Sequence, residues 1–179
     1  YYLGDWNDGS MKTGWQKITV YDNDKEDDMD YWFNFKSNGE KRKETKSWKS
    51  NGKTYAFDNR GVMVYQWTAI DTIDKDIASG SDTKKASIST WRYFNSPEDG
   101  ARVTKGWFKV VAPDDDNDNT FVDYKEDGFA SEDAGDETER WYYADANGIL
   151  YEGGIKSIKG KYYGFRPDDG DKGGAMLNG

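Results

Sequence analysis

The side chains available for chemistry in this chain are carboxylates, amines, phenols and aromatic rings, because its 179 residues include neither His nor Cys. Without His, the chain lacks the commonest general base, the Ser-His-Asp triad and the imidazole ligands of many metals. Without Cys, it lacks disulfides, thiolate zinc sites and a cysteine nucleophile. Any reaction or binding function must therefore use acids, Lys, Tyr or the faces of aromatic rings.

Two acidic runs place oxygen donors at alternating positions, which is the spacing of a calcium loop. The donors are Asp22, Asp24 and Glu26 in one run and Asp114, Asp116 and Asp118 in the other. An EF-hand is not formed, because the position that requires Gly for the sharp turn holds Asn119 or Phe121 when the loop starts at Asp114 or Asp116. An irregular calcium site is one alternative. The runs are more typical of solvent-exposed loops, and we predict no metal site.

Catalysis by paired carboxylates has no specific support in the sequence. A glycosidase needs two acids across a cleft, and among 34 Asp and Glu residues some pair is always available. The repeats described below also predict a thin fold without a deep pocket. We therefore predict that the chain is not an enzyme and carries no cofactor.

Charge and composition exclude further classes of function. The net charge of −9 argues against a nucleic-acid partner, and no apolar run approaches the roughly 18–20 residues of a membrane span. The chain has 8 Trp, 13 Tyr and 8 Phe but only 8 Ile, 7 Val and 3 Leu, the reverse of an ordinary core. Because Trp and Tyr are depleted in disordered chains, this composition predicts a folded protein with an aromatic core.

The aromatic residues recur in one pattern: an aromatic triplet, a turn that contains Gly, and then Gly-Trp or a substitute for it. The clearest copy runs from Tyr55 through Gly61 and Met63 to Trp67. Other copies begin at Tyr1, Trp32, Trp91, Trp141 and Tyr162, and the closing positions are Trp15, Trp48, Trp67, Trp107 and Ile155. Insertions between a closing residue and the next triplet predict longer strands with polar loops at their tips.

Each repeat is predicted to be a β-hairpin. Ile18 and Val20 alternate with polar neighbours at the period of a strand, and Asn-Gly and Asp-Gly pairs favour tight turns. One hairpin cannot bury its aromatic face alone, but stacked hairpins can. The predicted fold is therefore all-β, a solenoid of stacked β-hairpins with elongated hairpins and acidic loop tips.

The pattern resembles the cell-wall-binding repeats of Gram-positive surface proteins, which include choline-binding and glucan-binding repeats. The resemblance rests on Gly14-Trp15, Gly106-Trp107, residues 55–67, and residues 141–148, and it extends over nearly the whole chain. It implies that ligands bind in clefts between successive hairpins. In choline-binding members, rings of adjacent hairpins surround a quaternary ammonium group; in glucan-binding members, exposed rings stack on sugars.

The resemblance also implies which side chains bind the ligand. They are Trp15, Trp32, Trp48, Trp67, Trp91, Trp107 and Trp141. The first cage would use Trp15, Trp32 and Trp48, and the second would use Trp67, Trp91 and Trp107. A third would combine Trp107 with Trp141, where Ile155 replaces the closing Trp. The alternative is that these rings only pack between hairpins. The substitutions at Thr54, Ile155 and Tyr162, together with the insertions, favour a spacer or stalk that has lost the cages.

Residues 1–179 are expected to form a single array of about five to six hairpin units, as a fragment of a longer surface protein. The resemblance implies a non-catalytic, extracellular module that attaches its parent protein to the bacterial cell wall. Its partner would be a wall polymer, either choline-bearing teichoic acid or glucan, with no nucleic acid and no membrane insertion. The alternative is a structural spacer or protein-interaction stalk without ligand cages. The sequence leaves the oligomeric state open.

Overall fold

The computed structural model describes residues 1–4, 6–23, 25–71, 73, 88–113, 119–121, 138–167 and 173–177. These residues form ten strands in five antiparallel hairpins and one short 3-10 helix. The hairpins are β1 (Gly14–Asp22) with β2 (Asp27–Phe35), β3 (Thr45–Ser50) with β4 (Lys53–Phe57), β5 (Gln66–Ala69) with β6 (Trp91–Phe94), β7 (Gly106–Val111) with β8 (Glu139–Ala144), and β9 (Ile155–Ile158) with β10 (Lys161–Gly164). The helix η1 (Ile88–Thr90) directly precedes β6. Within these ranges, no helix is long and apolar enough to cross a membrane.

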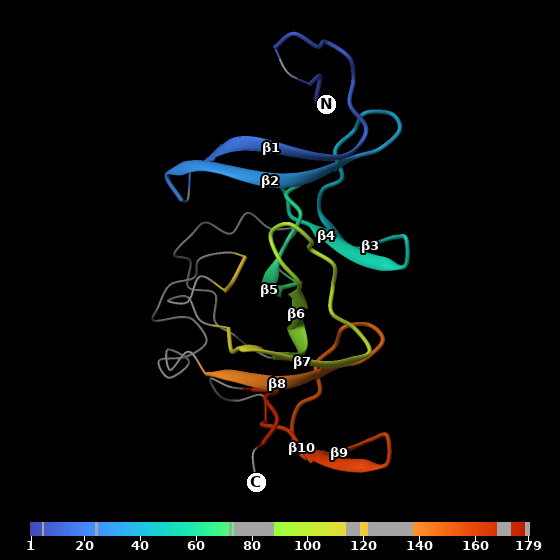
Figure 1. Ribbon diagram of the computed structural model, residues 1–179, viewed down its shortest axis with the longest axis vertical. Coiled ribbons are helices and arrows are strands. Elements are labelled where there is room, and N and C mark those ends of the chain that lie inside the picture. The colour runs from blue at the N-terminus through green and yellow to red at the C-terminus, as the bar shows by residue number, and fades with distance from the viewer. Residues whose placement is uncertain are drawn as a thin grey trace.

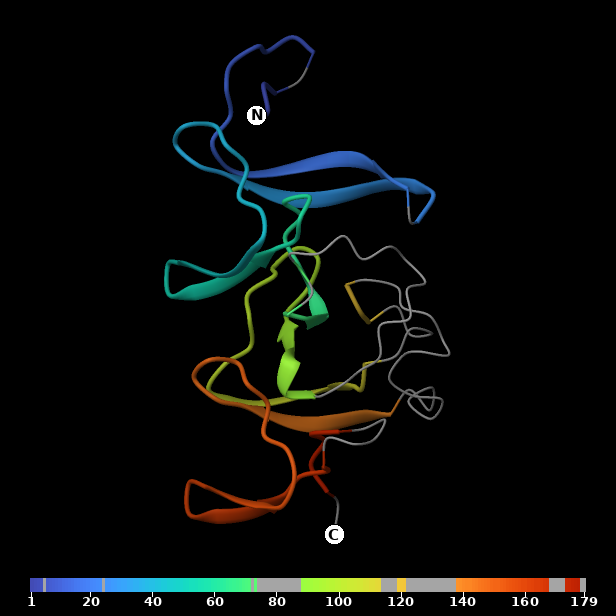
Figure 2. The same cartoon turned by 180° about the vertical axis from the view of Figure 1, so that it is seen from behind.

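The five hairpins follow one another along the long axis of the molecule in chain order (Figures 1 and 2). In the described residues every sheet has only two strands, so successive hairpins are joined by side chains and by single backbone hydrogen bonds rather than by a continuous sheet. After each hairpin, one residue of the following segment bridges back to the end of the second strand or to the residue after it, as Met63 does to Phe57 and Met176 to Phe165. The prediction of an all-β chain of hairpins is confirmed.

Hairpins that are three places apart lie in the same orientation. In Figure 1, β7–β8 lies like β1–β2, and β9–β10 lies like β3–β4. The backbone hydrogen bonds repeat in the same way: the Met63 amide donates to the Trp32 carbonyl at 2.9 Å, and the Met176 amide donates to the Trp141 carbonyl at 2.8 Å. The first two hairpins and the last two are therefore two copies of one structural unit.

Local sequence explains the hairpins. In β1, the side chains of Ile18 and Val20 are partly buried while those of Lys17 and Thr19 are exposed, which confirms the predicted alternation. The β3–β4 turn places Asn51 and Gly52 at φ values of 52° and 78°. Two successive residues with positive φ make the type of turn that matches the twist of a hairpin, and Asn-Gly is the pair that adopts it most easily.

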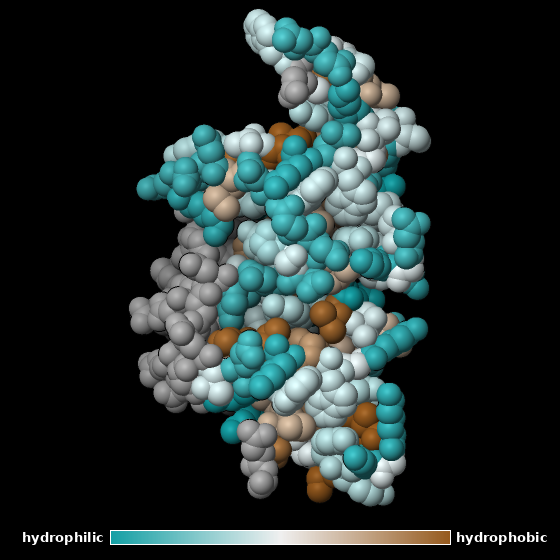
Figure 3. Space-filling view, in the orientation of Figure 1, coloured by the Kyte–Doolittle hydropathy of each residue, from teal (hydrophilic) through white to brown (hydrophobic). Residues whose placement is uncertain are grey.

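The core consists of aromatic rings held between hairpins, as the composition predicts. The largest fully buried side chains include Trp67, Trp91, Tyr142, Phe57, Phe94 and Phe165. Figure 3 shows that the surface over the hairpins is mostly hydrophilic or neutral, with small and separate hydrophobic patches. Flat rings supply large buried area per residue, which suits hairpins that offer little interior volume.

Asp22 corrects the prediction that residues 22–28 form an exposed acidic tip. It is only 4% exposed, accepts hydrogen bonds from Tyr31 Oη at 2.6 Å and Arg60 Nη1 at 3.0 Å, and so joins the first hairpin to the loop after the second. Burial raises its pKa, but these hydrogen bonds outweigh that effect and lower the pKa to about 2. Of the other acids considered for calcium, Glu26 is exposed, and Asp24 and residues 114–118 lie outside the described residues. Within the described part of the chain, no group of three or more acids is placed to hold a metal ion.

Replacement of Asp22 by Asn is expected to reduce stability in a pH-dependent way. Because its pKa is depressed in the folded state, the stabilisation is present in full above about pH 4 and is lost as the pH falls towards 2; it amounts to about 2 kcal/mol. Urea unfolding should therefore show that Asp22→Asn lowers the free energy of unfolding at pH 7 by about this amount and has little effect at pH 2. The exposed Asp28→Asn is the matched control. Parallel pH profiles for wild type and Asp22→Asn would contradict the account.

Candidate functional site

Two pockets lie at junctions between successive hairpins and share four lining residues of matching type, two Trp, one Tyr and one Met. Site A, at the junction of β1–β2 with β3–β4, is lined by Trp15, Trp32, Tyr55, Met63, Glu98 and Asp99. Site B, at the junction of β7–β8 with β9–β10, is lined by Trp107, Trp141, Tyr163 and Met176. The cavities are similar in size, about 260 Å³ and about 300 Å³.

The hairpins position the lining residues of site A. Trp15 on β1 and Trp32 on β2 come from one hairpin, and Tyr55 comes from β4 of the next. Met63 is fixed twice, by its bridge to Phe57 on β4 and by its amide hydrogen bond to the Trp32 carbonyl. The pocket therefore exists only when both hairpins are packed together. Site B is built in the same way from the fourth and fifth hairpins.

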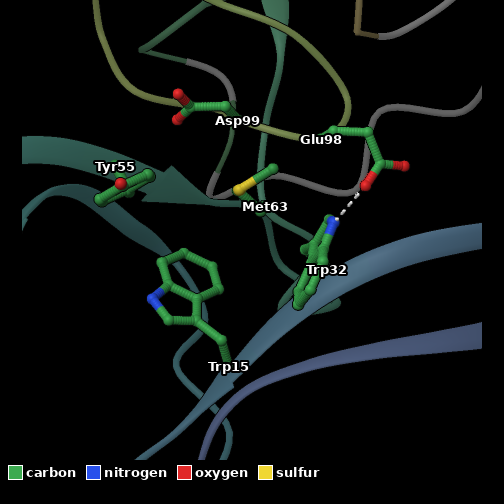
Figure 4. A pocket seen from close by; sticks show the side chains of 6 residues that line it. All are labelled: Trp15, Trp32, Tyr55, Met63, Glu98 and Asp99. Carbon is green, nitrogen blue, oxygen red and sulfur yellow. Dashed lines mark hydrogen bonds between the residues drawn. The ribbon is translucent and has the colours of Figure 1, made fainter.

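The rings of each site are arranged as the walls of a box. In site A, the Trp15 and Trp32 rings are 6.4 Å apart at an interplanar angle of 82°, and Tyr55 lies 5.0 Å from Trp15 at 66°. In site B, the ring centroids of Trp107 and Trp141 are 6.3 Å apart at an interplanar angle of 89°, and those of Trp107 and Tyr163 are 4.8 Å apart at 66°. Figure 4 shows the three aromatic side chains and Met63 around an open space. The geometry is thus repeated closely at two places in the chain.

Site A also has two carboxylates, contributed by the loop between β6 and β7. The Trp32 indole Nε1 donates to Glu98 at 3.1 Å, which Figure 4 draws as a dashed line, and Lys17 Nζ donates to the other Glu98 oxygen at 2.7 Å. The hydrogen bonds from Lys17 and Trp32 hold the pKa of Glu98 below its usual value, so the carboxylate is ionised at neutral pH. Asp99 forms a longer ion pair of 3.4 Å with Lys53.

The structure brings together two of the three residues of the first predicted cage. Trp15 and Trp32 line site A, but Trp48 does not belong to the lining. A β-bulge between Thr45 and Trp48 shifts the strand register, so that Trp48 lies opposite Tyr55. The Trp48 ring packs 5.8 Å from Trp15, and the guanidinium of Arg42 lies 4.2 Å from its centroid. Tyr55 takes the place in the box that the sequence analysis gave to Trp48.

The second predicted cage is not formed. Trp67 and Trp91 are 0% and 1% exposed, so neither ring has a free face for a ligand. The Trp67 indole Nε1 donates to the Val111 carbonyl at 2.8 Å, which is a structural role. Trp107, the third member of this set, lines site B with Trp141 instead. These two form the set in which Ile155 replaces the closing Trp, and Tyr163 supplies the missing wall.

The junction of β5–β6 with β7–β8 explains why Trp67 and Trp91 are buried. Four residues here occupy the positions that form the box elsewhere, when positions are counted from the bridge that follows each hairpin: Trp67, Trp91, Tyr142 and Leu150. Here the same cluster also contains Ile88 from η1 and Ala175 from the C-terminal segment. Protein side chains thus fill the space that a ligand would need.

The remaining described junction, between β3–β4 and β5–β6, lacks the residues of a box. Arg102 occupies the position of Met63, since it bridges to Phe94 and its amide donates to the Thr54 carbonyl at 2.8 Å. Arg92 likewise occupies the position of the wall residue Tyr55, two residues before the bridged Phe. Guanidinium groups in these places would repel a cationic ligand.

Six lining residues were not predicted from the sequence. Tyr55 and Tyr163 follow Thr54 and Tyr162, the residues that replace the triplet Trp, so the aromatic ring has moved by one position. These tyrosines are recognisable as the aromatic after a substituted triplet position. Met63 and Met176 fit the Met position of the repeat pattern. Glu98 and its neighbour Asp99 had no signal, because they come from the loop after a different hairpin.

No protein-family model and no curated protein sequence matches this chain. Among solved structures, the chain is similar to choline-binding protein F from Streptococcus pneumoniae, with 18% identity and a TM-score of 0.54 over 99% of this chain. It also matches the choline-binding domain of Spr1274 in Streptococcus pneumoniae, with 20% identity and a TM-score of 0.34 over 75% of this chain and 95% of that domain. A third match is the modular autolysin LytC from Streptococcus pneumoniae, with 19% identity and a TM-score of 0.31 over 99% of this chain and 41% of that protein.

Only the first of these TM-scores is high enough to compare folds. At 18% identity, this match shows a likeness of fold alone. The chain spans 40% of the length of choline-binding protein F. The described hairpins of this chain therefore share the fold of choline-binding protein F.

Proposed function

We propose that this chain is a non-catalytic binding module that holds a quaternary ammonium group, such as that of choline, in each of sites A and B. The observation that carries the proposal is the repetition of two Trp, one Tyr and one Met in the same geometry at two hairpin junctions. Four residues of matching type in matching positions are more than aromatic packing requires, because the other described junctions are closed or lack the box.

The shape of the boxes favours a compact cation over a sugar. A cation is attracted by the faces of several rings at once, and perpendicular walls offer those faces from different sides. The Met thioether adds a polarisable apolar contact for the methyl groups. A sugar ring instead stacks on one flat exposed platform with hydrogen-bonding groups around it. The net charge of −9 also attracts a cation to the protein.

The positions of the two sites favour a polymer with several choline groups as the partner. The first and fourth hairpins have the same orientation (Figure 1), so we expect sites A and B, which use matching positions of these hairpins, to open on the same side of the molecule. Two modest sites that engage one polymer bind it more tightly than either site alone. A choline-bearing teichoic acid of the bacterial cell wall fits this requirement, and it places the chain outside the cell, attached to the wall.

Tryptophan fluorescence titrations test the proposal. We expect choline to change the emission saturably and to raise the melting temperature, because a ligand that binds only the folded state stabilises it. Choline-bearing cell wall should retain the protein, and free choline should release it. Soluble α- and β-glucans should have no effect. A response to glucan alone would contradict choline as the ligand, and no response to any of these would leave the structural spacer as the function.

A further inference from the structure

Sites A and B have matching rings but differ in charge. We propose that Glu98 is a specificity-determining residue, which makes site A select a quaternary ammonium over a neutral ligand of the same shape, while site B lacks this selection. The inference rests on the proposed function, because it concerns what the aromatic box of site A recognises.

The position of Glu98 is fixed by the fold. Its loop is closed by the hydrogen bond from the Asn95 amide to the Ala101 carbonyl at 3.0 Å. Gly100 in this loop packs so closely that a Cβ there would lie 2.5 Å from the Val64 carbonyl and 2.8 Å from Met63 Sδ. The loop is therefore seated against Met63, one wall of the box. This contact brings Glu98 to the pocket from a third hairpin.

The carboxylate of Glu98 is held at the pocket with its charge intact. One oxygen accepts from Trp32 Nε1, so the group is anchored to a wall of the box, and the other accepts from Lys17 Nζ. Glu98 lines the cavity, whereas Lys17 is not among the lining residues. A cation in the box thus lies nearer to the carboxylate than to the ammonium. The indole hydrogen bond also fixes the orientation of the Trp32 ring.

Site B has a Lys at the place of Lys17 but, among the lining residues that the structure describes, no counterpart of Glu98. Lys109 is paired with Trp141 across the hairpin just as Lys17 is paired with Trp32. In site B, however, the Lys109 ammonium lies 5.9 Å from the Trp141 ring centroid, and the described lining residues include no acid. The ammonium therefore already interacts with a ring that a ligand would use. Both differences make site B less selective for a cation.

The test compares choline with its neutral carbon isostere, 3,3-dimethylbutan-1-ol, by isothermal titration calorimetry. Trp141→Ala leaves site A as the only intact box, and Trp32→Ala leaves site B. In the Trp141→Ala background, Glu98→Gln should weaken choline binding about three- to tenfold, since a nearby charge is lost. It should change the affinity of the neutral isostere less than twofold, because Gln can still accept the Trp32 hydrogen bond. About 0.5 M NaCl should weaken choline binding at site A more before the substitution than after it.

The outcomes separate this inference from the proposed function. Equal choline affinities with and without Glu98→Gln would overturn the role of Glu98 and leave choline binding intact. An equal loss for choline and the neutral isostere would also overturn it, because Glu98 would then only support the ring. Choline that binds neither background would overturn the proposed function and this inference together. In the Trp32→Ala background, Glu98→Gln should have no effect on site B.

Discussion

Replacement of Trp32 by Ala is expected to abolish choline binding at site A and to leave site B unchanged. Trp32 forms one perpendicular wall of the box and anchors Glu98, and its ring is only partly buried, so its removal does not open the core. Loss of a cation–π wall and of the apolar contact with the methyl groups should weaken binding at this site at least about 30-fold. Titration calorimetry should then show one remaining site per chain.

Trp141→Ala gives the reciprocal experiment at site B, and Trp6→Ala gives the matched control. Trp141 is 42% exposed, and Trp6 is 99% exposed and lines neither pocket. We expect one site to remain after Trp141→Ala and both sites to remain after Trp6→Ala. Loss of both sites from a single substitution, with the melting temperature unchanged, would show that the two boxes are not independent binding sites.

Replacement of Trp67 by Ala is expected to destabilise the fold severely. Its ring is completely buried, it contacts Tyr93, Phe108 and Tyr142 at centroid distances of 5.2, 6.1 and 5.2 Å, and its indole N–H donates to the Val111 carbonyl. Truncation of such a ring typically costs about 3–5 kcal/mol. A domain of ordinary stability would retain little of it. Thermal and urea unfolding followed by circular dichroism measure the loss.

A milder variant distinguishes core packing from ligand binding at the same position. Trp67→Phe should keep most of the packing and therefore fold, with a smaller loss of stability, and it should still bind choline at both sites. Trp6→Ala should change the free energy of unfolding by no more than about 0.5 kcal/mol. A folded Trp67→Phe protein that has lost a choline site would show that Trp67 belongs to a binding site after all.

The sequence predicts the hairpins well because they depend on local features. Alternation around Ile18 and Val20, and turns such as Asn51-Gly52, are determined by neighbours along the chain. The closeness of Trp15 to Trp32 follows from the same register, in which Trp15 pairs with Asn34 and Trp32 with Lys17, so that the two rings are diagonal neighbours across one hairpin. These parts of the fold and of site A could be read from the repeat because they need no information about distant segments.

Whether a box is open depends on contacts that the repeat pattern does not contain. Trp67 and Trp91 hold the same positions in the repeat as Trp15 and Trp32, yet their box is filled by Ile88 and other side chains. Ile88 comes from the insertion between β5 and β6, and its packing is decided by the tertiary fold. The bulge that removes Trp48 from site A is likewise invisible in a pattern of residue types.

The burial of Asp22 has the same cause. An acid at the start of an acidic run is expected to be solvated, but its partner Arg60 lies 38 residues away, in the loop after the second hairpin. Buried charges are tolerated when they are paired and hydrogen-bonded, and only the stacking of two hairpins brings this pair together. An acid in an acidic run can therefore be buried when the fold brings a distant basic residue next to it.

The number of choline molecules bound per chain at saturation tests the central claim most directly. Equilibrium dialysis with labelled choline should give two per chain for the wild type, one for Trp32→Ala, one for Trp141→Ala and none for the double variant. Zero for the folded wild-type protein would contradict the claim that the two boxes are ligand sites. Three would contradict the claim that the box of Trp67 and Trp91 is filled by the protein itself.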